Sequence, residues 1–387
     1  MEQHDFDFSN MKDHDANHNA IDHPENSAEY ASLTVNKGVA QPPMTNHYLK
    51  LKARPRRRNI TAAEYVEGIR KGNVTMLGQA VTLVESQLPE HQSLAQEVIE
   101  KCLPYAGKSV RIGISGVPGA GKSTSIDAFG IHVLKEYGGK LAVLAIDPSS
   151  ERSKGSILGD KTRMEKLSVQ KDAFIRPSPS AGSLGGVARK TRETIVLCEA
   201  AGYDNIFVET VGVGQSETAV HSMVDFFLLI QLAGTGDELQ GIKRGIMEMA
   251  DGIVINKCDG DNVERAKLAA AQFRSALHLF PTPPSGWSPK VLTYSGYYEL
   301  GIDEVWKMID EYFEFVHKNG YFEERRRQQE KYWMYETINE QLKRHFYTNP
   351  VIEEMLAAKK QMVLSARQSS FVAASDVLDY YFKNIKI

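Results

Sequence analysis

Apolar positions in the middle of the chain form short, nearly continuous runs, separated by longer stretches with a helical spacing of apolar residues. In one such stretch, Leu239, Ile242, Ile246 and Met249 follow at steps of three, four and three, which puts them on one helix face. Near-continuous apolar strands that alternate with helices indicate a parallel sheet covered on both faces. The pattern therefore predicts an α/β fold with a doubly wound, mostly parallel sheet between about residues 105 and 318. The predicted strands are VRIGIS (110–115), LAVLAID (141–147), NIFVET (205–210), FFLLIQLA (226–233), GIVINK (252–257) and KVLTYS (290–295).

Helical patterns flank the predicted sheet on both sides. Residues 59–104 carry apolar residues at spacings of mostly three and four, which predicts an N-terminal helical region. Residues 319–387 contain two amphipathic stretches, the second from residue 350 to about 382, and the first has Tyr335, Ile338, Leu342 and Phe346 on one face. Such faces pack either on the chain's own sheet or on a second subunit. We expect 319–387 to be a C-terminal helical dimerisation region.

The first 58 residues are polar and contain few apolar side chains, so we expect a disordered tail. The formal net charge of −3 argues against a general binder of nucleic acid or membrane surfaces. No apolar run approaches the roughly 18–20 residues that cross a bilayer. The three cysteines lie far apart, and the N-terminus resembles neither a signal peptide nor a transit peptide. These features predict a protein of the reducing cytoplasm.

The stretch GISGVPGAGKST (113–124) matches the phosphate-binding loop G-x-x-x-x-G-K-[ST], and it lies between a predicted strand and a predicted helix. Backbone N–H groups at such a helix start wrap around phosphate oxygens. Lys122 adds a positive charge near the β- and γ-phosphates, and the Ser123 hydroxyl is placed for Mg²⁺. The predicted contacts to the phosphates are Gly116, Val117, Pro118, Gly119, Ala120, Gly121, Lys122, Ser123 and Thr124.

The nucleotide base is indicated by NKCD (256–259) at the end of a predicted strand. The Asp259 carboxylate can accept hydrogen bonds from two donors of guanine, where adenine presents an acceptor, and such a site can reject the wrong base by about 10⁴-fold or more. The Lys257 stem would pack along the base, and the backbone N–H of Ser295 is placed to support the base oxygen. GTP is therefore preferred over ATP. The predicted base contacts are Asn256, Lys257, Asp259, Ser295, Gly296 and Tyr297.

Two acidic residues, Asp147 and Glu209, end predicted strands, where carboxylates can hold the Mg²⁺ shell. The N–H of Gly212 could contact the γ-phosphate, like the glycine in the D-x-x-G motif of Ras-type GTPases. Ras-type enzymes carry a water-orienting glutamine directly after that glycine, but this chain has Val213. A valine cannot orient water, so we expect slow intrinsic hydrolysis.

With these motifs in place, the chain resembles the MeaB-type GTPases, which are accessory proteins of adenosylcobalamin-dependent methylmalonyl-CoA mutase and include the methylmalonic aciduria type A protein. The resemblance covers about residue 60 to the C-terminus. The stretches that carry it include AIDPSS (145–150), GSILGDKTRM (155–164), VETVGVGQSE (208–217) and GDELQGIKRGI (236–246). One departure is Glu151–Lys154, where a more Thr/Gly-like segment is expected.

The resemblance implies a P-loop GTPase that guards cofactor loading and integrity of the mutase, and a homodimer held by the C-terminal helical arm. It implies a mobile loop at GTGDELQGIK (234–243), and we hypothesise that Lys243 in this loop makes a charged contact when the mutase activates the enzyme. The resemblance assigns γ-phosphate and Mg²⁺ sensing to Asp147, Asp160 and Glu209. With the phosphate-loop motif and the Lys243 hypothesis added, the predicted catalytic residues are Lys122, Asp160, Glu209 and Lys243, and the predicted Mg²⁺ ligands are Ser123, Asp147, Asp160 and Glu209. The expected cofactors are GTP or GDP and Mg²⁺.

Two alternative functions stay open at this point. Nickel-inserting maturation GTPases share this type of domain, and five histidines of the tail could bind a divalent metal loosely: His4, His14, His18, His23 and His47. Their spacing is irregular, and no cysteine pair supports a defined site. The other alternative is an ATP-dependent, transport-associated kinase, against which the NKCD motif argues.

Overall fold

The computed structural model of the chain describes residues 60–86, 88–146, 163–177, 184–210, 216–233 and 244–384. The predicted tail, 1–58, lies outside the described residues. Within the part that is described, no helix combines the length and the apolar character that crossing a membrane requires.

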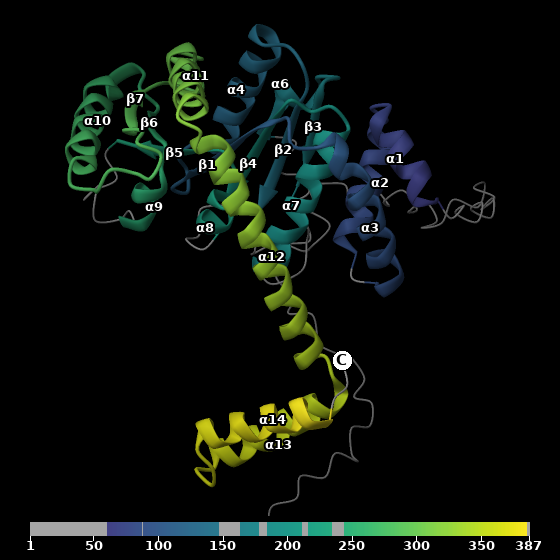
Figure 1. The fold of residues 1–387 in the computed structure, drawn as a ribbon. Coiled ribbons are helices and arrows are strands. Elements are labelled where there is room, and N and C mark those ends of the chain that lie inside the picture. Colours follow the sequence, from purple (N-terminus) through teal and green to yellow (C-terminus); the bar gives the residue numbers. More distant parts are fainter. Residues whose placement is uncertain are drawn as a thin grey trace, which may run out of the picture. The chain divides into compact units, whose positions relative to one another are not determined.

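A seven-stranded parallel sheet forms the centre of the described chain (Figure 1), and it confirms the predicted α/β class. The strand order is β3-β2-β4-β1-β5-β6-β7. Six strands coincide with the predicted apolar runs, whereas β3 was not predicted, because its four residues include only two large apolar side chains, Phe174 and Ile175. The strands are β1 (Val110–Gly116), β2 (Leu141–Ile146), β3 (Ala173–Arg176), β4 (Asn205–Thr210), β5 (Phe226–Leu232), β6 (Gly252–Asn256) and β7 (Lys290–Thr293).

The central strands contribute side chains to two hydrophobic cores, one on each face of the sheet. Consecutive residues of a strand belong to different cores because their side chains point to opposite faces. In β5, Phe226 and Leu228 belong to one core, and Phe227 and Leu229 belong to the other. Helices α4 (Lys122–Glu136) and α11 (Ile302–Lys318) cover the first face. The second face is covered by α7 (Leu184–Ala200), α8 (Ser216–His221), α9 (Arg244–Met249) and α10 (Val263–Leu277). The sheet is therefore doubly wound, as predicted.

The N-terminal helical region consists of α1 (Ala62–Arg70), α2 (Val74–Glu85) and α3 (Pro89–Cys102), followed by the short helix η2 (Leu103–Tyr105). Thr61 and Glu64 form a capping box that fixes the start of α1. The buried faces of the three helices join the core that includes α7, with Ile69, Leu77 and Val98 fully enclosed. These helices therefore extend one face of the α/β unit.

The C-terminal region consists of three further helices, α12 (Tyr321–Tyr347), α13 (Pro350–Leu364) and α14 (Ser370–Asn384). Arg325, Gln329 and Trp333 are buried on the first four turns of α12. Further along α12 most of the large apolar side chains are exposed, whereas Phe346 packs against a small core that α13 and α14 form around Ile352, Val377 and Tyr381. Two shorter helices complete the description, α6 (Glu165–Ser168) beside α4 and η3 (Gly260–Asn262) before α10.

Candidate nucleotide-binding site

The candidate site lies at the carboxyl ends of the parallel strands, where β1, β4, β6 and β7 end in the residues predicted to bind nucleotide. Strand β1 pairs with β4 on one side and with β5 on the other, so connections leave it toward both halves of the sheet. Ligands of open α/β sheets bind in the crevice outside the carboxyl ends at such a switch point. The topology therefore brings the two predicted motifs, GVPGAGKS and NKCD, to one edge.

The phosphate loop joins the end of β1 to the first residue of α4, as the motif predicts. Gly119 and Gly121 have positive φ angles of 79° and 83°, which glycine adopts without the steric cost that other residues meet. A Cβ on Gly116 would come within 2.2 Å of the Ile230 carbonyl oxygen, so only glycine fits between β1 and β5. These glycines leave the loop's N–H groups at the start of a 15-residue helix, an arrangement suited to an anion.

Lys122 is buried at the base of the phosphate loop. Its Nζ donates hydrogen bonds to the carbonyl oxygens of Gly116 (2.9 Å) and Val117 (3.4 Å), which curls the loop around the ammonium group. Burial lowers the pKa of Lys122, and the negative charges of Glu209 and Glu217 oppose part of this effect. Glu217 is buried on α8 and was not among the predicted site residues. The available signal was its position at the end of the stretch VETVGVGQSE (208–217). The cation is thus held inside the loop that would carry the phosphates.

Two of the predicted Mg²⁺ ligands meet beside this lysine. The Ser123 hydroxyl donates to Oε1 of Glu209 at 3.4 Å, and Glu209 is buried near the end of β4. A hydroxyl and a carboxylate are hard oxygen donors that suit Mg²⁺ together with phosphate oxygens. Within the described ranges no group of three or more His, Cys, Asp or Glu side chains could hold a metal ion. The Ser123 hydroxyl and the Glu209 carboxylate offer oxygen ligands of the kind that Mg²⁺ prefers.

Asn256 connects the base motif to the phosphate loop. Its Nδ2 donates to the Ala120 carbonyl oxygen at 2.7 Å, and its Oδ1 accepts from the N–H groups of Lys257 (2.7 Å) and Gly296 (3.0 Å). Lys257 has a φ of 59°, so the chain turns sharply after β6. Tyr297 is 76% exposed at the rim of the site. One buried amide thus ties together three predicted nucleotide-binding segments.

Asp259 is oriented by a buried serine. The Ser295 hydroxyl donates to Oδ2 of Asp259 at 2.6 Å and accepts from the N–H of Tyr298 at 3.3 Å. The backbone N–H of Ser295 donates to the Leu300 carbonyl oxygen at 2.9 Å. The expectation that this N–H faces the base was therefore wrong, because a two-way backbone pairing with Leu300 uses it. Ser295 acts through its side chain on the carboxylate.

The family model described as methylmalonyl Co-A mutase-associated GTPase MeaB matches residues 77–351 of this chain, a range that includes the phosphate loop, Glu209 and the NKCD motif. The chain belongs to the MeaB family of GTPases.

Several relatives of this MeaB family member resemble it over most of its length. The GTPase ArgK of Escherichia coli is 45% identical over 326 residues, which cover 83% of this chain and 98% of ArgK. The mitochondrial methylmalonic aciduria type A homolog of Mus musculus is 47% identical over 327 residues, which cover 82% of this chain and 78% of that protein. A crystal structure of an LAO/AO transport system kinase superposes with a TM-score of 0.68 at 38% identity, covering 84% of this chain and 99% of that one.

Four predicted site residues of this MeaB family member lie outside the described residues: Asp147, Asp160, Gly212 and Lys243. The same holds for Val213, for the segment Glu151–Lys154 and for the predicted mobile loop 234–243. The described part of the chain therefore contains the phosphate loop, the base motif and Glu209, one of the three predicted acidic Mg²⁺ ligands.

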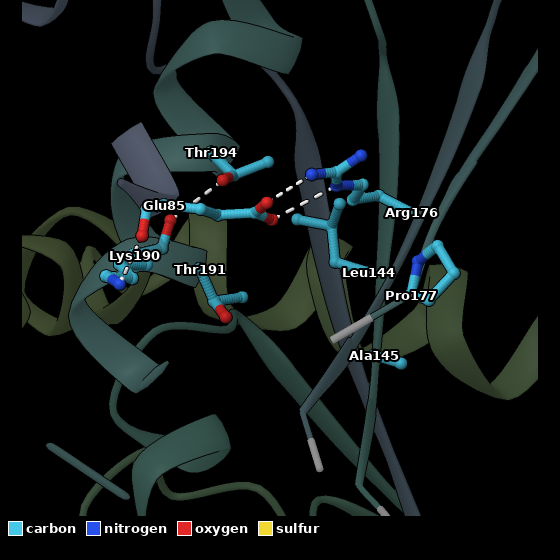
Figure 2. Close-up of a pocket in the computed structure, with 8 residues that line it drawn as sticks. All are labelled: Glu85, Leu144, Ala145, Arg176, Pro177, Lys190, Thr191 and Thr194. Carbon is cyan, nitrogen blue, oxygen red and sulfur yellow. Dashed lines mark hydrogen bonds and ion pairs between the residues drawn. The ribbon is translucent and has the colours of Figure 1, made fainter. Parts of the chain in front are cut away.

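A small pocket, partly open to solvent, lies between α2, α7 and the strands β2 and β3 (Figure 2). Arg176 of β3 forms an ion pair with Glu85 at the end of α2, and Lys190 of α7 donates to the Glu85 carbonyl oxygen. Thr191 and Thr194, also in the lining, donate to carbonyl oxygens of their own helix. The polar groups are thus used within the chain, and the pocket marks the joint between the N-terminal helices and the sheet.

Proposed function

We propose that the chain is a GTP-binding and GTP-hydrolysing chaperone that assists the adenosylcobalamin loading and protection of methylmalonyl-CoA mutase. The observation that carries the nucleotide assignment is the Asp259 carboxylate, held by Ser295 beside the link from Asn256 to the phosphate loop. An ionised carboxylate is an acceptor only, so it matches the two donors of guanine and opposes the acceptor of adenine. Membership in a GTPase family associated with methylmalonyl-CoA mutase supports the choice of partner.

In this proposal, the phosphates lie in the loop Gly116–Thr124, and Lys122 offers its ammonium group to the β- and γ-phosphates. Ser123, Asp147, Asp160 and Glu209 are the residues that would hold Mg²⁺, which neutralises phosphate charge when bound. The N–H of Gly212 would sense the γ-phosphate. Asn256, Lys257, Asp259, Ser295, Gly296 and Tyr297 would surround the base, with Ser295 acting through Asp259.

Hydrolysis without a partner should be slow, because Val213 stands where Ras-type enzymes orient water and a valine has no polar group for that task. A partner that supplies or repositions a catalytic group can accelerate such an enzyme by about 10³–10⁵-fold. We propose that the mutase is this partner and that Lys243, in the loop 234–243, makes a charged contact in the activated complex.

A homodimer formed through the C-terminal helices is also proposed. Large apolar side chains are exposed along the last turns of α12 and on α13 and α14, among them Ile338, Leu342, Phe371 and Phe382. A second copy of the chain would cover them, since a self-complementary contact buries the same faces on both subunits.

Competition between nucleotides tests the base assignment. GTP and GDP should displace a bound fluorescent guanine nucleotide at concentrations at least about 10³-fold below those that ATP or ADP needs, because adenine offers the carboxylate no donor pair. Equal displacement by ATP would contradict the base assignment and would instead favour the ATP-dependent, transport-associated kinase that is the alternative function.

A further inference from the structure

The two segments that would grip a guanine nucleotide come from different parts of the fold, so their spacing must be set by contacts between them. The phosphate loop precedes α4, and the base-contacting segments follow β6 and β7. One contact is the bond from Asn256 to the Ala120 carbonyl oxygen. The segments lie so close that a Cβ on Gly121 would be 2.7 Å from the Asn256 amide nitrogen.

A second link joins the same segments through two hydroxyl groups. Ser125, on the first turn of α4, and Tyr294, directly after β7, have their hydroxyl oxygens 2.6 Å apart. Both residues are almost fully buried, with 0% and 2% of their surface exposed. The Tyr294 ring also stacks on Phe129 of α4 with a centroid separation of 5.5 Å. Water therefore cannot replace this hydrogen bond.

The direction of the hydrogen bond follows from counting protons. A serine hydroxyl has one proton, and the Ser125 hydroxyl donates it to the Gly121 carbonyl oxygen at 2.8 Å. Its oxygen then accepts from Tyr294 and, at 3.4 Å, from the amide of Asn256. The chain of donors thus runs from Tyr294 through Ser125 to Gly121 of the phosphate loop.

The backbone of Tyr294 holds the base motif at the same time. Its N–H donates to the Ile255 carbonyl oxygen, and its carbonyl oxygen accepts from the N–H of Cys258, both at 3.0 Å. These bonds bracket Asn256 and Lys257. The next residue, Ser295, carries the hydroxyl that orients Asp259. A shift of Tyr294 would therefore move the base motif and the Asp259 partner together.

We propose that Tyr294 and Ser125 are positioning residues, whose hydroxyl pair fixes the distance between the phosphate loop and the guanine-binding segments and thereby sets the affinity for guanine nucleotides. The inference rests on the proposed function of the chain as a GTPase. Without the pair, the nucleotide-bound protein samples spacings in which the phosphate loop and the guanine-binding segments do not hold the nucleotide together, so release becomes faster and the affinity falls.

The test compares Tyr294→Phe, Ser125→Ala and the double variant by stopped-flow release of a fluorescent GDP analogue from the full chain. Tyr294→Phe should release GDP about 3- to 10-fold faster, the range expected for one neutral hydrogen bond. Ser125→Ala should release it faster still, because it leaves the buried Tyr294 hydroxyl without an acceptor. The double variant should be no faster than Ser125→Ala, since it removes the stranded donor. The KM for GTP should rise while kcat at saturating GTP stays unchanged.

Tyr312→Phe is the matched control. Tyr312 is an equally buried tyrosine, and its hydroxyl bonds to the Asp225 carbonyl oxygen and to Arg325, next to the start of β5 rather than the site. This variant should lower the melting temperature and leave GDP release unchanged.

Release from Tyr294→Phe within twofold of wild type, together with a melting shift like that of Tyr312→Phe, would overturn the inference and leave the pair a structural bond. A wild-type chain that does not bind GDP would overturn the proposed function itself and the inference with it.

Discussion

At the scale of single residues, the choice of nucleotide rests on one carboxylate and on the hydroxyl that orients it. Ser295 is fully buried, and its hydroxyl donates to one oxygen of Asp259 while it accepts from the N–H of Tyr298. The proton of the serine hydroxyl is used in the hydrogen bond to Asp259, and this bond fixes the orientation of the carboxylate. Specificity at this position then depends on whether the base offers donors or acceptors.

Replacing Asp259 by asparagine should exchange the preferred base. The new side chain would present an amide that can donate to the carbonyl group of xanthine, which guanine replaces with an amino group. We expect Asp259→Asn to weaken GDP binding by about 10²-fold or more, because the guanine amino group loses its charged acceptor and faces an amide donor instead, and to strengthen binding of xanthosine diphosphate. Titration of both nucleotides measures this. The exposed neighbour Asp261→Asn is the matched control, and a parallel loss of GDP affinity there would contradict the assignment.

The buried side chain of His221 makes the stability of the fold depend on pH. It packs edge-on against Phe227 with ring centroids 5.8 Å apart. Burial lowers its pKa to about 3, and the positive charge of Arg325 adds to the effect. Between about pH 6.5 and pH 3 the unfolded chain binds a proton at this residue and the folded chain does not, so stability falls as the pH decreases through that window.

Between pH 7 and pH 5, this residue should therefore cost the folded state up to about 2 kcal/mol. Urea unfolding at both pH values measures the loss, which should be smaller by that amount in His221→Gln. The matched control is His317→Gln, at a histidine whose side chain is half exposed. It measures the change in stability that follows from replacing a histidine that is not buried. An identical loss in wild type and His221→Gln would show that His221 takes up its proton in the folded state.

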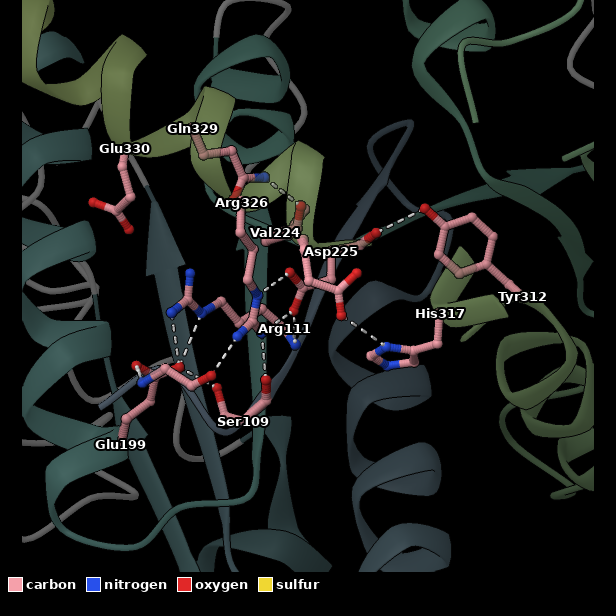
Figure 3. Close-up of polar contacts among 12 residues, drawn as sticks. Ser109, Arg111, Glu199, Val224, Asp225, Tyr312, His317, Arg326, Gln329 and Glu330 are labelled. Carbon is pink, nitrogen blue, oxygen red and sulfur yellow. Dashed lines mark hydrogen bonds and ion pairs between the residues drawn. The ribbon is translucent and has the colours of Figure 1, made fainter. Parts of the chain in front are cut away.

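At the scale of elements, the helix α12 is fastened to the amino-terminal edge of the sheet (Figure 3). Arg326 donates two hydrogen bonds to Asp225, at 2.9 and 2.7 Å, and one to the Ser109 carbonyl oxygen at 2.6 Å. One turn further, Gln329 donates to the Val224 carbonyl oxygen and Trp333 to that of Ser222. These contacts bind α12 to the segment between α8 and β5.

Arg326→Ala should be strongly destabilising, because it leaves the carboxylate of Asp225 buried without its cation. We expect a loss of about 3–5 kcal/mol in the free energy of unfolding, measured by urea denaturation. Arg327 is the matched control, since it lies on the same helix and pairs with the partly exposed Glu324, three residues earlier. Arg327→Ala should change stability by less than about 1 kcal/mol, and equal losses in the two variants would contradict the anchoring role.

The sequence predicts the elements whose signal is local and misses those that depend on distant partners. The six apolar runs and the phosphate loop could be found because strand burial and loop geometry impose their own residue patterns. Strand β3 is too short to stand out. The stretch EERRRQQEK at the start of α12 reads as solvated charge, although Arg325 and Gln329 are buried against partners far along the chain. The Ser125–Tyr294 pair joins residues 169 positions apart, and no local pattern marks it.

At the scale of the whole molecule, the described chain leaves a run of apolar side chains on its C-terminal helices without cover from the sheet. Phe371 and Phe382 are 85% and 75% exposed on α14, and Leu364 is 71% exposed at the end of α13. Large apolar side chains exposed in this number on neighbouring helices favour an interaction site. A second copy of the chain is the occupant that we propose.

Removing residues 349–387 should convert the proposed dimer to a monomer that still binds GDP. The cut must fall after Thr348, because a cut at residue 320 would also remove the anchors Arg325, Arg326 and Trp333. Light scattering measures the mass, and GDP titration confirms that the nucleotide site is folded. A truncated chain that stays dimeric would place the interface outside α13 and α14.

In the proposed function, binding to a partner protein turns a slow GTPase into a fast one. The most direct measurement is phosphate release from GTP by the full chain, alone and with adenosylcobalamin-dependent methylmalonyl-CoA mutase, with ATP as the parallel substrate and Lys243→Ala as the matched variant. We expect slow hydrolysis alone, stimulation by the mutase that can reach about 10³-fold or more, no comparable activity with ATP, and loss of the stimulation in Lys243→Ala at unchanged GTP affinity. Hydrolysis of GTP that the mutase leaves unchanged, or an equal rate with ATP, would contradict the proposed function.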